Sequence, residues 1–377
     1  MAKSKAYRFI FLMGLVSLLA DFTYEGAKGV MGPYLAYLGA GALAVSWISG
    51  LSELAGYWVR LLSGFLSDRL KSYWFFTLTG YAINLFSVPL LGFVKSWQFA
   101  GFLIFLERSG KGLRTPSRDV LLSRATAVVG HGKGFGFHEF LDQIGAVLGP
   151  LTVGLILLLG YGYKTAFLFL LIPALTALLL LLIAKRNYGE DLEKAERSET
   201  SSSLSKAFYT YLLGSCLISL SSLQFPLIGF HLSEHVRFDG WTVAFLFAFA
   251  MGVDALSALA FGFLHDKIGF RSLFWGLLPG ALVSPLLFYV SQPILAVLFW
   301  GVSLGFQESV LRSGVAMLSS EVSRGKAYGL FHFFFGFCAF LGGVFMGFLY
   351  EASKEALILY TVALHLLAIG ILIKLKP

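Results

Sequence analysis

Long apolar runs, each ended by glycine, proline or a charged residue, constrain this chain more than any other feature. An apolar stretch of about 20–25 residues is long enough to cross a bilayer as a helix. Such runs fall at residues 7–36, 42–68, 73–94, 97–122, 132–160, 163–184, 207–234, 240–266, 271–290, 293–317, 325–350 and 354–375. Only 13% of the residues are charged, roughly half the share found in soluble domains. The sequence therefore predicts an all-α polytopic membrane protein with twelve transmembrane helices.

A polar break divides these runs into two sets of six. Residues 185–206 hold mixed charge and a Ser/Thr run, which is typical of a solvated linker. The octapeptide GFLSDRLK, which begins at Gly64, has a counterpart in GFLHDKIGFR, which begins 198 residues later at Gly262. We therefore predict two pseudo-symmetric six-helix bundles, at 1–184 and 207–377, joined by a cytoplasmic linker.

A second repeat concerns glycines. The segment GKGFGFHEFLDQIGAVLGPLTVG begins at Gly132, and GKAYGLFHFFFGFCAFLGGVFMG begins at Gly325. Glycines stand at the same offsets in both, at 132, 136, 149 and 154 and at 325, 329, 342 and 347. Glycines repeated along a membrane helix allow neighbouring backbones to approach closely. We therefore expect these two helices to pack tightly against their neighbours.

The distribution of Lys and Arg predicts the orientation. With the N-terminus in the cytoplasm, the inner segments hold eighteen of these residues and the outer loops four, namely Lys95, Lys164, Arg237 and Lys354. The positive-inside rule then places both termini in the cytoplasm, with the chain integral to the inner membrane. The net charge of +8 is thereby assigned to lipid headgroups, and no nucleic-acid partner is expected. The expected partners are a small-molecule substrate and membrane lipid, and the chain is expected to act as a monomer.

Several motifs carry a resemblance to a known family. The Gly-x-x-x-Asp-Arg/Lys turn after the second helix and again after the eighth resembles that of the major facilitator superfamily. Arg108-x-x-x-Gly112 resembles the second motif of that family, and Gly145-x-x-x-Gly149-Pro150-x-x-x-Gly154 resembles its antiporter motif, with Val153 where a glycine is common. The segments DFTYE, GKGLRTPSRD and FGFHEFLD resemble a bacterial branch described only as transporters. The resemblance implies two bundles that rock around a substrate site at the membrane midplane.

The first helix carries charges that a membrane span rarely tolerates. Asp21, Glu25 and Lys28 follow the spacing i, i+4, i+7 and therefore share one face. A carboxyl group near mid-membrane needs a partner, a wet cavity or a proton. We expect Asp21 and Glu25 to couple transport to protons or to contact substrate. The alternative is a salt bridge, such as Glu25 with Lys28, that only holds helices together.

The fourth helix is the most polar. Glu107, Lys111, Arg114 and Arg118 form a single stripe, and Arg108 stands beside it near the midplane. The resemblance assigns the Arg108 position a role in proton coupling. The acids expected to pair with Arg108 are Asp142 and Glu53. A purely structural ion-pair network is the alternative.

Further coupling or substrate residues are expected among the remaining acids within the spans. Glu139 adds to the acids of the first half, and Asp254 is the best candidate of the second half. Most of the acids and bases inside spans fall in the first half, so ion coupling is expected there. The second half is expected to contribute an apolar, aromatic wall.

The repeated turns predict a gate at the inner ends of the helices. Acids at helix ends can bind neighbouring helix N-termini and basic side chains. The expected gate residues are Gly64, Asp68, Arg69, Arg118 and Asp119 in the first half, and Gly262, Asp266 and Lys267 in the second. Simple topology charges are the alternative.

The function expected from these features is proton-coupled secondary transport by alternating access, with efflux of an amphipathic or cationic small molecule favoured. The alternatives are symport or exchange of a carboxylate or phosphate solute at Lys111 and Arg114, and flipping of a lipid-like substrate. The sequence contains no Walker-type, HExxH or GxSxG motif, so an enzyme is not expected. Neither a metal site nor a cofactor is expected, and H⁺ is the expected coupling ion.

Overall fold

The computed structural model describes residues 3–192, 204–269, 272–319 and 324–373. Within these ranges every regular element is helical, and no strand is present. In the first half the helices are α1 (Lys3–Lys28), α2 (Met31–Tyr37), α3 (Ala42–Leu70), α4 (Tyr73–Leu90) with the short η1 (Leu91–Phe93), α5 (Trp97–Val129), α6 (His131–Leu158), α7 (Tyr163–Phe169) and α8 (Leu171–Leu192).

In the second half the helices are α9 (Lys206–Ser221), α10 (Phe225–Glu234), α11 (Gly240–Ile268), α12 (Ser272–Ser284) with η3 (Pro285–Tyr289), α13 (Pro293–Phe306) with η4 (Gln307–Leu311), α14 (Arg312–Met317), α15 (Arg324–Ala352) and α16 (Lys354–Leu372). These helices fall into the twelve predicted segments. The predicted all-α membrane fold is therefore confirmed. The helix before the linker is longer than expected, because α8 continues to Leu192, and most of the remaining linker lies outside the described residues.

Nine of the described helical segments are long and apolar enough to cross a membrane. The long helices α3 and α5 are not among them. Helix α5 corresponds to the predicted fourth transmembrane helix. It is excluded by composition, because its sequence combines apolar residues with the charged stripe of that helix. A helix of this kind must direct its charges toward other protein groups.

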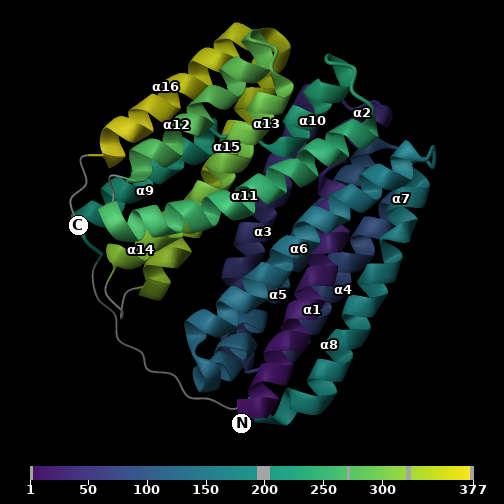
Figure 1. Cartoon of the computed structure of the whole chain (residues 1–377), viewed down its shortest axis with the longest axis vertical. Helices are drawn as coiled ribbons and strands as arrows, with labels where there is room; N and C mark the ends of the chain where they lie inside the picture. The colour runs from purple at the N-terminus through teal and green to yellow at the C-terminus, as the bar shows by residue number, and fades with distance from the viewer. Residues whose placement is uncertain (1–2, 193–203, 270–271, 320–323, 374–377) are drawn as a thin grey trace. The chain divides into compact units, whose positions relative to one another are not determined.

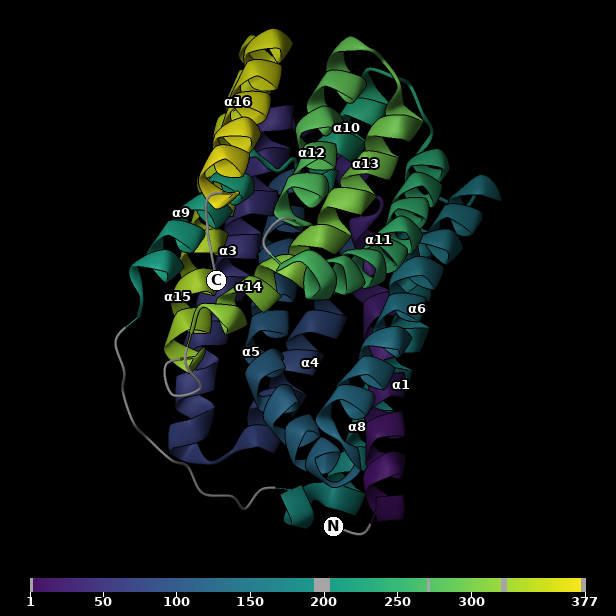
Figure 2. The same cartoon turned by 60° about the vertical axis from the view of Figure 1, so that its left-hand side comes forward.

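Tertiary contacts divide the chain into two units. Unit 1 comprises Met1–Ala40, Ala55–Arg197 and Ser233–Ala248, and unit 2 comprises Gly41–Leu54, Ser198–Leu232 and Phe249–Pro377. In unit 1, α1 packs along α6 and α8 (Figure 1). In unit 2, α9 packs along α15 and α16 (Figure 2). The units differ from the two halves of the sequence, because the start of α3 groups with unit 2 and the start of α11 with unit 1.

Two repeated glycines explain how α6 and α15 pack. A Cβ added at Gly149 would collide with the backbone carbonyl of Phe22 in α1, and one added at Gly342 would collide with that of Leu220 in α9. Close approach of the backbones therefore requires glycine at both positions. The predicted tight packing is confirmed at these two sites.

The first helical segment of each half is broken, which was not predicted from the sequence. The chain turns at Gly29 between α1 and α2, and again after Ser222 between α9 and α10. Pro33 and Pro226 follow these breaks by four residues. A proline cannot bond the carbonyl four residues before it, and its ring clashes with that carbonyl. The prolines were therefore the available signal for both breaks.

Candidate functional site

A group of charged and aromatic side chains lies inside unit 1, where α1, α4, α5 and α6 pack together. We call it the polar cluster. Its members are Asp21, Tyr24, Glu25, Lys28, Tyr81, Asn84, Glu107, Arg108, Lys111, Arg114, Arg118, Asp119, His138 and Asp142. The structure therefore brings together the charged residues predicted on the first, fourth and fifth helices.

Glu25 is the acid with two basic partners in the cluster. Its carboxylate lies 3.4 Å from Lys28 Nζ and 4.0 Å from Lys111 Nζ. Only 6% of Glu25 is exposed, so these cations compensate a buried charge. The expected salt bridge with Lys28 is present, and Lys111 connects it to α5.

Tyr24 occupies the centre of the cluster, and its role was not predicted from the sequence. Its ring centroid lies 4.1 Å from Lys111 Nζ and 5.9 Å from the guanidinium carbons of both Arg108 and Arg114. Its hydroxyl donates a hydrogen bond of 2.5 Å to Asp21 Oδ1. Aromatic faces attract cations, so Tyr24 holds three positive groups near one carboxylate. The available signal was its place between the two acids of DFTYE.

Arg114 is almost completely buried, with 1% of its surface exposed. Its guanidinium carbon lies 4.0 Å from the Tyr81 ring centroid. Among the described residues, no hydrogen-bond partner meets its Nε or Nη1 atoms. A buried donor without an acceptor costs free energy. Arg114 therefore has two N–H groups that an additional acceptor can satisfy.

Arg108 contacts the acid that precedes it in the sequence. Its Nε atom lies 3.5 Å from Glu107 Oε2, and Asn84 donates a 2.7 Å hydrogen bond to Glu107 Oε1. Asp142 lies beside His138, and the pairing of Arg108 with Asp142 or Glu53 stays a prediction.

A buried chain of three side chains joins α1 to α6. Ser17 Oγ lies 2.8 Å from His138 Nε2, and His138 Nδ1 lies 3.5 Å from Asp142 Oδ2. Tyr81 and Arg118 also reach the Ser17 hydroxyl, at 3.3 and 3.5 Å. Neither Ser17 nor His138 was assigned a role from the sequence, although His138 stands four residues before Asp142.

The predicted gate residues of the first half are distributed over two places. Arg118 donates hydrogen bonds of 2.9 and 2.8 Å to Asp119. Asp68 accepts a 3.0 Å hydrogen bond from the hydroxyl of Tyr73, the first residue of α4. Arg69 is exposed in the last turn of α3. A Cβ at Gly64 would meet only ordinary contacts, the nearest being 3.6 Å from Pro116.

The second-half gate residues give less information. A Cβ at Gly262 would meet nothing within 4 Å, so close packing does not explain this glycine. Lys267 is exposed, and the Asp266 side chain lies outside the described side chains. The gate remains a prediction. Of the other predicted acids, Glu139 is exposed and Asp254 is buried within α11.

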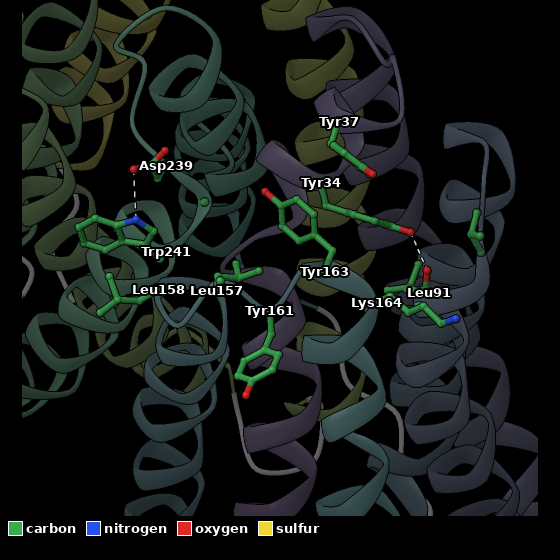
Figure 3. Close-up of a pocket in the computed structure, with 15 residues that line it drawn as sticks. Tyr34, Tyr37, Leu91, Leu157, Leu158, Tyr161, Tyr163, Lys164, Asp239 and Trp241 are labelled. Carbon is green, nitrogen blue, oxygen red and sulfur yellow. Dashed lines mark hydrogen bonds between the residues drawn. The ribbon is translucent and has the colours of Figure 1, made fainter.

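Unit 1 also contains a cavity of about 660 Å³. Its walls include the aromatic residues Tyr34, Tyr37, Tyr161, Tyr163 and Trp241 and the charged residues Lys164 and Asp239. Figure 3 shows Tyr34 and Tyr37 beside Tyr163, with Trp241 joined to Asp239. No sequence motif indicates this cavity. Its lining residues come from the ends of several elements, which no local pattern connects.

Metal ligation is not indicated in the part of the chain that the structure describes, where no group of three or more His, Cys, Asp or Glu side chains is arranged to hold an ion. His231 of α10 lies 2.8 Å from the Tyr350 hydroxyl.

Comparison with known proteins finds a matching family model and similar proteins. The model of the Major Facilitator Superfamily matches residues 11–343. An uncharacterized protein of Mycobacterium tuberculosis is 37% identical, covering 98% of this chain and 93% of the relative. An uncharacterized MFS-type transporter of Methanocaldococcus jannaschii is 28% identical, covering 93% of this chain and 90% of the relative.

Solved structures give the same fold at low identity. The nucleoside transporter NupG is 14% identical with a TM-score of 0.77, covering 98% of this chain and 100% of that chain. A bacterial homologue of the human lysosomal transporter Spinster is 13% identical with a TM-score of 0.74, covering 100% of both chains.

The family match spans most of the chain, and the apolar helices agree with it. Both support an integral membrane protein that transports a small molecule and is not an enzyme. This chain belongs to the major facilitator superfamily.

Proposed function

We propose that this chain is a proton-coupled secondary transporter of a small solute with a carboxylate or phosphate group, which binds Arg114 and Lys111. The observation that carries this proposal is the buried guanidinium of Arg114, whose Nε and Nη1 atoms meet no acceptor among the described residues. An arginine fork matches the geometry of carboxylate and phosphate oxygens. This favours the anionic alternative over cation efflux.

Proton coupling follows from competition for the same cations. Tyr24 donates a hydrogen bond to Asp21, and its ring holds Lys111 and Arg114 close to that carboxylate. A substrate anion and an ionised Asp21 therefore compete for them. Protonation of Asp21 releases the cations and raises the affinity for the anion, and by linkage the bound anion favours proton uptake. A proton and an anion bound together are what symport requires.

Ligand-dependent thermal stability of the purified chain tests the proposal. A ligand at about 100 times its Kd stabilises the fold by about 2.7 kcal/mol. We expect stabilisation by members of a panel of carboxylates and phosphates, stronger at pH 5.5 than at pH 8. Arg114→Gln is expected to abolish it, whereas Arg186→Gln, at an exposed position of α8, leaves it unchanged. Stabilisation that is the same in both variants contradicts the proposed site.

Proton-coupled efflux of an amphipathic or cationic solute is the second candidate. Asp142 Oδ1 and Gln143 Oε1 are buried acceptors that meet no hydrogen-bond donor within the described ranges. An ammonium group would supply such donors. In the same panel, this function predicts stabilisation by organic cations at pH 8 that weakens at pH 5.5, because the proton and the cation compete for Asp142. Asp142→Asn would then remove the effect.

A further inference from the structure

We propose that the aromatic cavity of unit 1 is a second ligand site, separate from the polar cluster, which binds an organic cation with an aromatic or apolar body. The cavity measures about 660 Å³, which is within the range of about 300–1,000 Å³ typical of small-molecule sites. All of its lining residues belong to unit 1. None of them is a member of the polar cluster.

The walls of the cavity present ring faces. The ring centroid of Tyr163 lies 5.3 Å from that of Tyr34 and 5.5 Å from that of Tyr37, and the planes are tilted by 58° and 47°. The three rings therefore face different directions around the same space (Figure 3). Tilted aromatic rings that surround a space are the arrangement that holds quaternary ammonium groups.

Two polar groups of the cavity walls form hydrogen bonds within the protein. The Tyr34 hydroxyl donates a 2.6 Å hydrogen bond to the Leu91 carbonyl, and Trp241 Nε1 donates a 3.1 Å hydrogen bond to Asp239 Oδ2. These two side chains therefore offer a ligand their aromatic faces. The bond from Trp241 also fixes the Asp239 carboxylate beside an aromatic ring. A carboxylate held in this way adds a charge that attracts a cation.

The one basic residue of the lining does not oppose this assignment. Lys164 is exposed, and its Nζ atom lies 5.6 Å from the centroid of Phe93. Its flexible side chain keeps the ammonium group solvated while the stem lies along the protein. This contact also shows that a cation beside an aromatic ring is already part of this region. Four glycines, Gly92, Gly160, Gly162 and Gly240, belong to the lining without adding side chains.

Equilibrium binding of benzyltrimethylammonium to the full-length chain in nanodiscs tests the proposal. We expect one saturable site and much weaker binding of phenylacetate, which has a similar ring and the opposite charge. Tyr163→Ala and Asp239→Asn are each expected to weaken binding by about tenfold. Tyr163→Phe retains the ring and is expected to bind like the wild type. Tyr209→Ala, at an exposed tyrosine of α9, is the matched control.

Arg114→Gln separates this site from the polar cluster. It is expected to leave benzyltrimethylammonium binding unchanged, so the two proposals can fail independently. Three results would overturn the second site: no saturable binding to the wild type, equal binding of phenylacetate, or binding that Arg114→Gln removes and Tyr163→Ala does not. A melting temperature measured for each variant shows whether lost binding reflects lost folding.

Discussion

Helix α6 of unit 1 and helix α15 of unit 2 both pack through glycines at matching positions, but they differ in the side chains that precede Gly149 and Gly342. Gly149 and Gly342 occupy matching positions of the sequence repeat, and each faces a backbone carbonyl of a neighbouring helix. In the same repeat, His138 and Asp142 of α6 correspond to Phe331 and Phe335 of α15.

The two pairs of side chains make different contacts. Phe331 and Phe335 stack with centroids 5.4 Å apart and planes 24° apart, and they pack with the apolar core of unit 2. The pair His138 and Asp142 instead joins Ser17 to the polar cluster. Backbone packing thus needs the glycines and does not need charge. Because buried charge is costly, its presence in α6 is better explained by transport than by folding.

Exchanging the two pairs of side chains between α6 and α15 should have the largest effect on stability and on transport. Phe331→His with Phe335→Asp places polar groups in an apolar core and is expected to lower the free energy of unfolding by about 3 kcal/mol or more. The reverse exchange, His138→Phe with Asp142→Phe, is expected to leave stability unchanged or raise it by about 1 kcal/mol, while transport is lost. Unfolding in detergent and uptake into proteoliposomes measure the two effects. Similar destabilisation by both exchanges would contradict the comparison.

The next largest effect is expected at Arg114. Arg114→Gln removes the charge proposed to bind the substrate anion and should weaken anion binding by about 100-fold. Its melting temperature without ligand should be unchanged or higher, because a buried charge is removed. Arg114→Lys should recover part of the binding, since it restores the charge but not the planar fork. Full activity in Arg114→Gln would exclude this residue from the site.

The shared packing device can be tested at its two glycines. Gly149→Ala and Gly342→Ala are each expected to lower the free energy of unfolding by about 1–3 kcal/mol, because the added Cβ meets backbone. Gly370→Ala is the control, since a Cβ there meets nothing within 4 Å. It should be neutral or stabilising by about 0.5–1 kcal/mol. Equal behaviour of all three variants would show that close approach does not require the glycines.

Substitution of Tyr24 is expected to have a smaller effect on anion affinity. Tyr24→Phe retains the ring beside the three cations but removes the hydroxyl that binds Asp21. Asp21 then competes more strongly for Lys111 and Arg114, and anion affinity should fall by about fivefold. Tyr24→Leu should reduce it further, because the ring is also lost. Isothermal titration with a stabilising anion measures both, and Tyr209→Phe serves as the exposed control.

Most of the fold could be predicted from the sequence, because helix length and apolar composition are local properties. The twelve segments are an example. Charges inside spans also identified Asp21, Glu25, Lys111 and Arg114, since the membrane makes such residues conspicuous. Apart from the salt bridge of Glu25 with Lys28, their partners could not be predicted in this way. Which groups meet depends on the rotation and depth of each helix, and neither property is visible in a single sequence.

The same limit explains why some residues of the sites were not predicted. Tyr24 is one of 16 tyrosines in the chain, and no sequence pattern sets Ser17 or His138 apart. Only their contacts distinguish these three residues. The aromatic cavity combines residues from α2, α7 and the start of α11. Sequence patterns describe one helix at a time, whereas a site of this kind forms where several elements end.

The most direct test of the central claim is the pH dependence of anion binding in the wild type and in Asp21→Asn. We predict that the Kd of a stabilising carboxylate or phosphate is lower at pH 5.5 than at pH 8 in the wild type. In Asp21→Asn, which mimics the protonated acid, the Kd should be low at both values of pH. Anion binding in the wild type that does not change with pH would contradict proton coupling through the polar cluster.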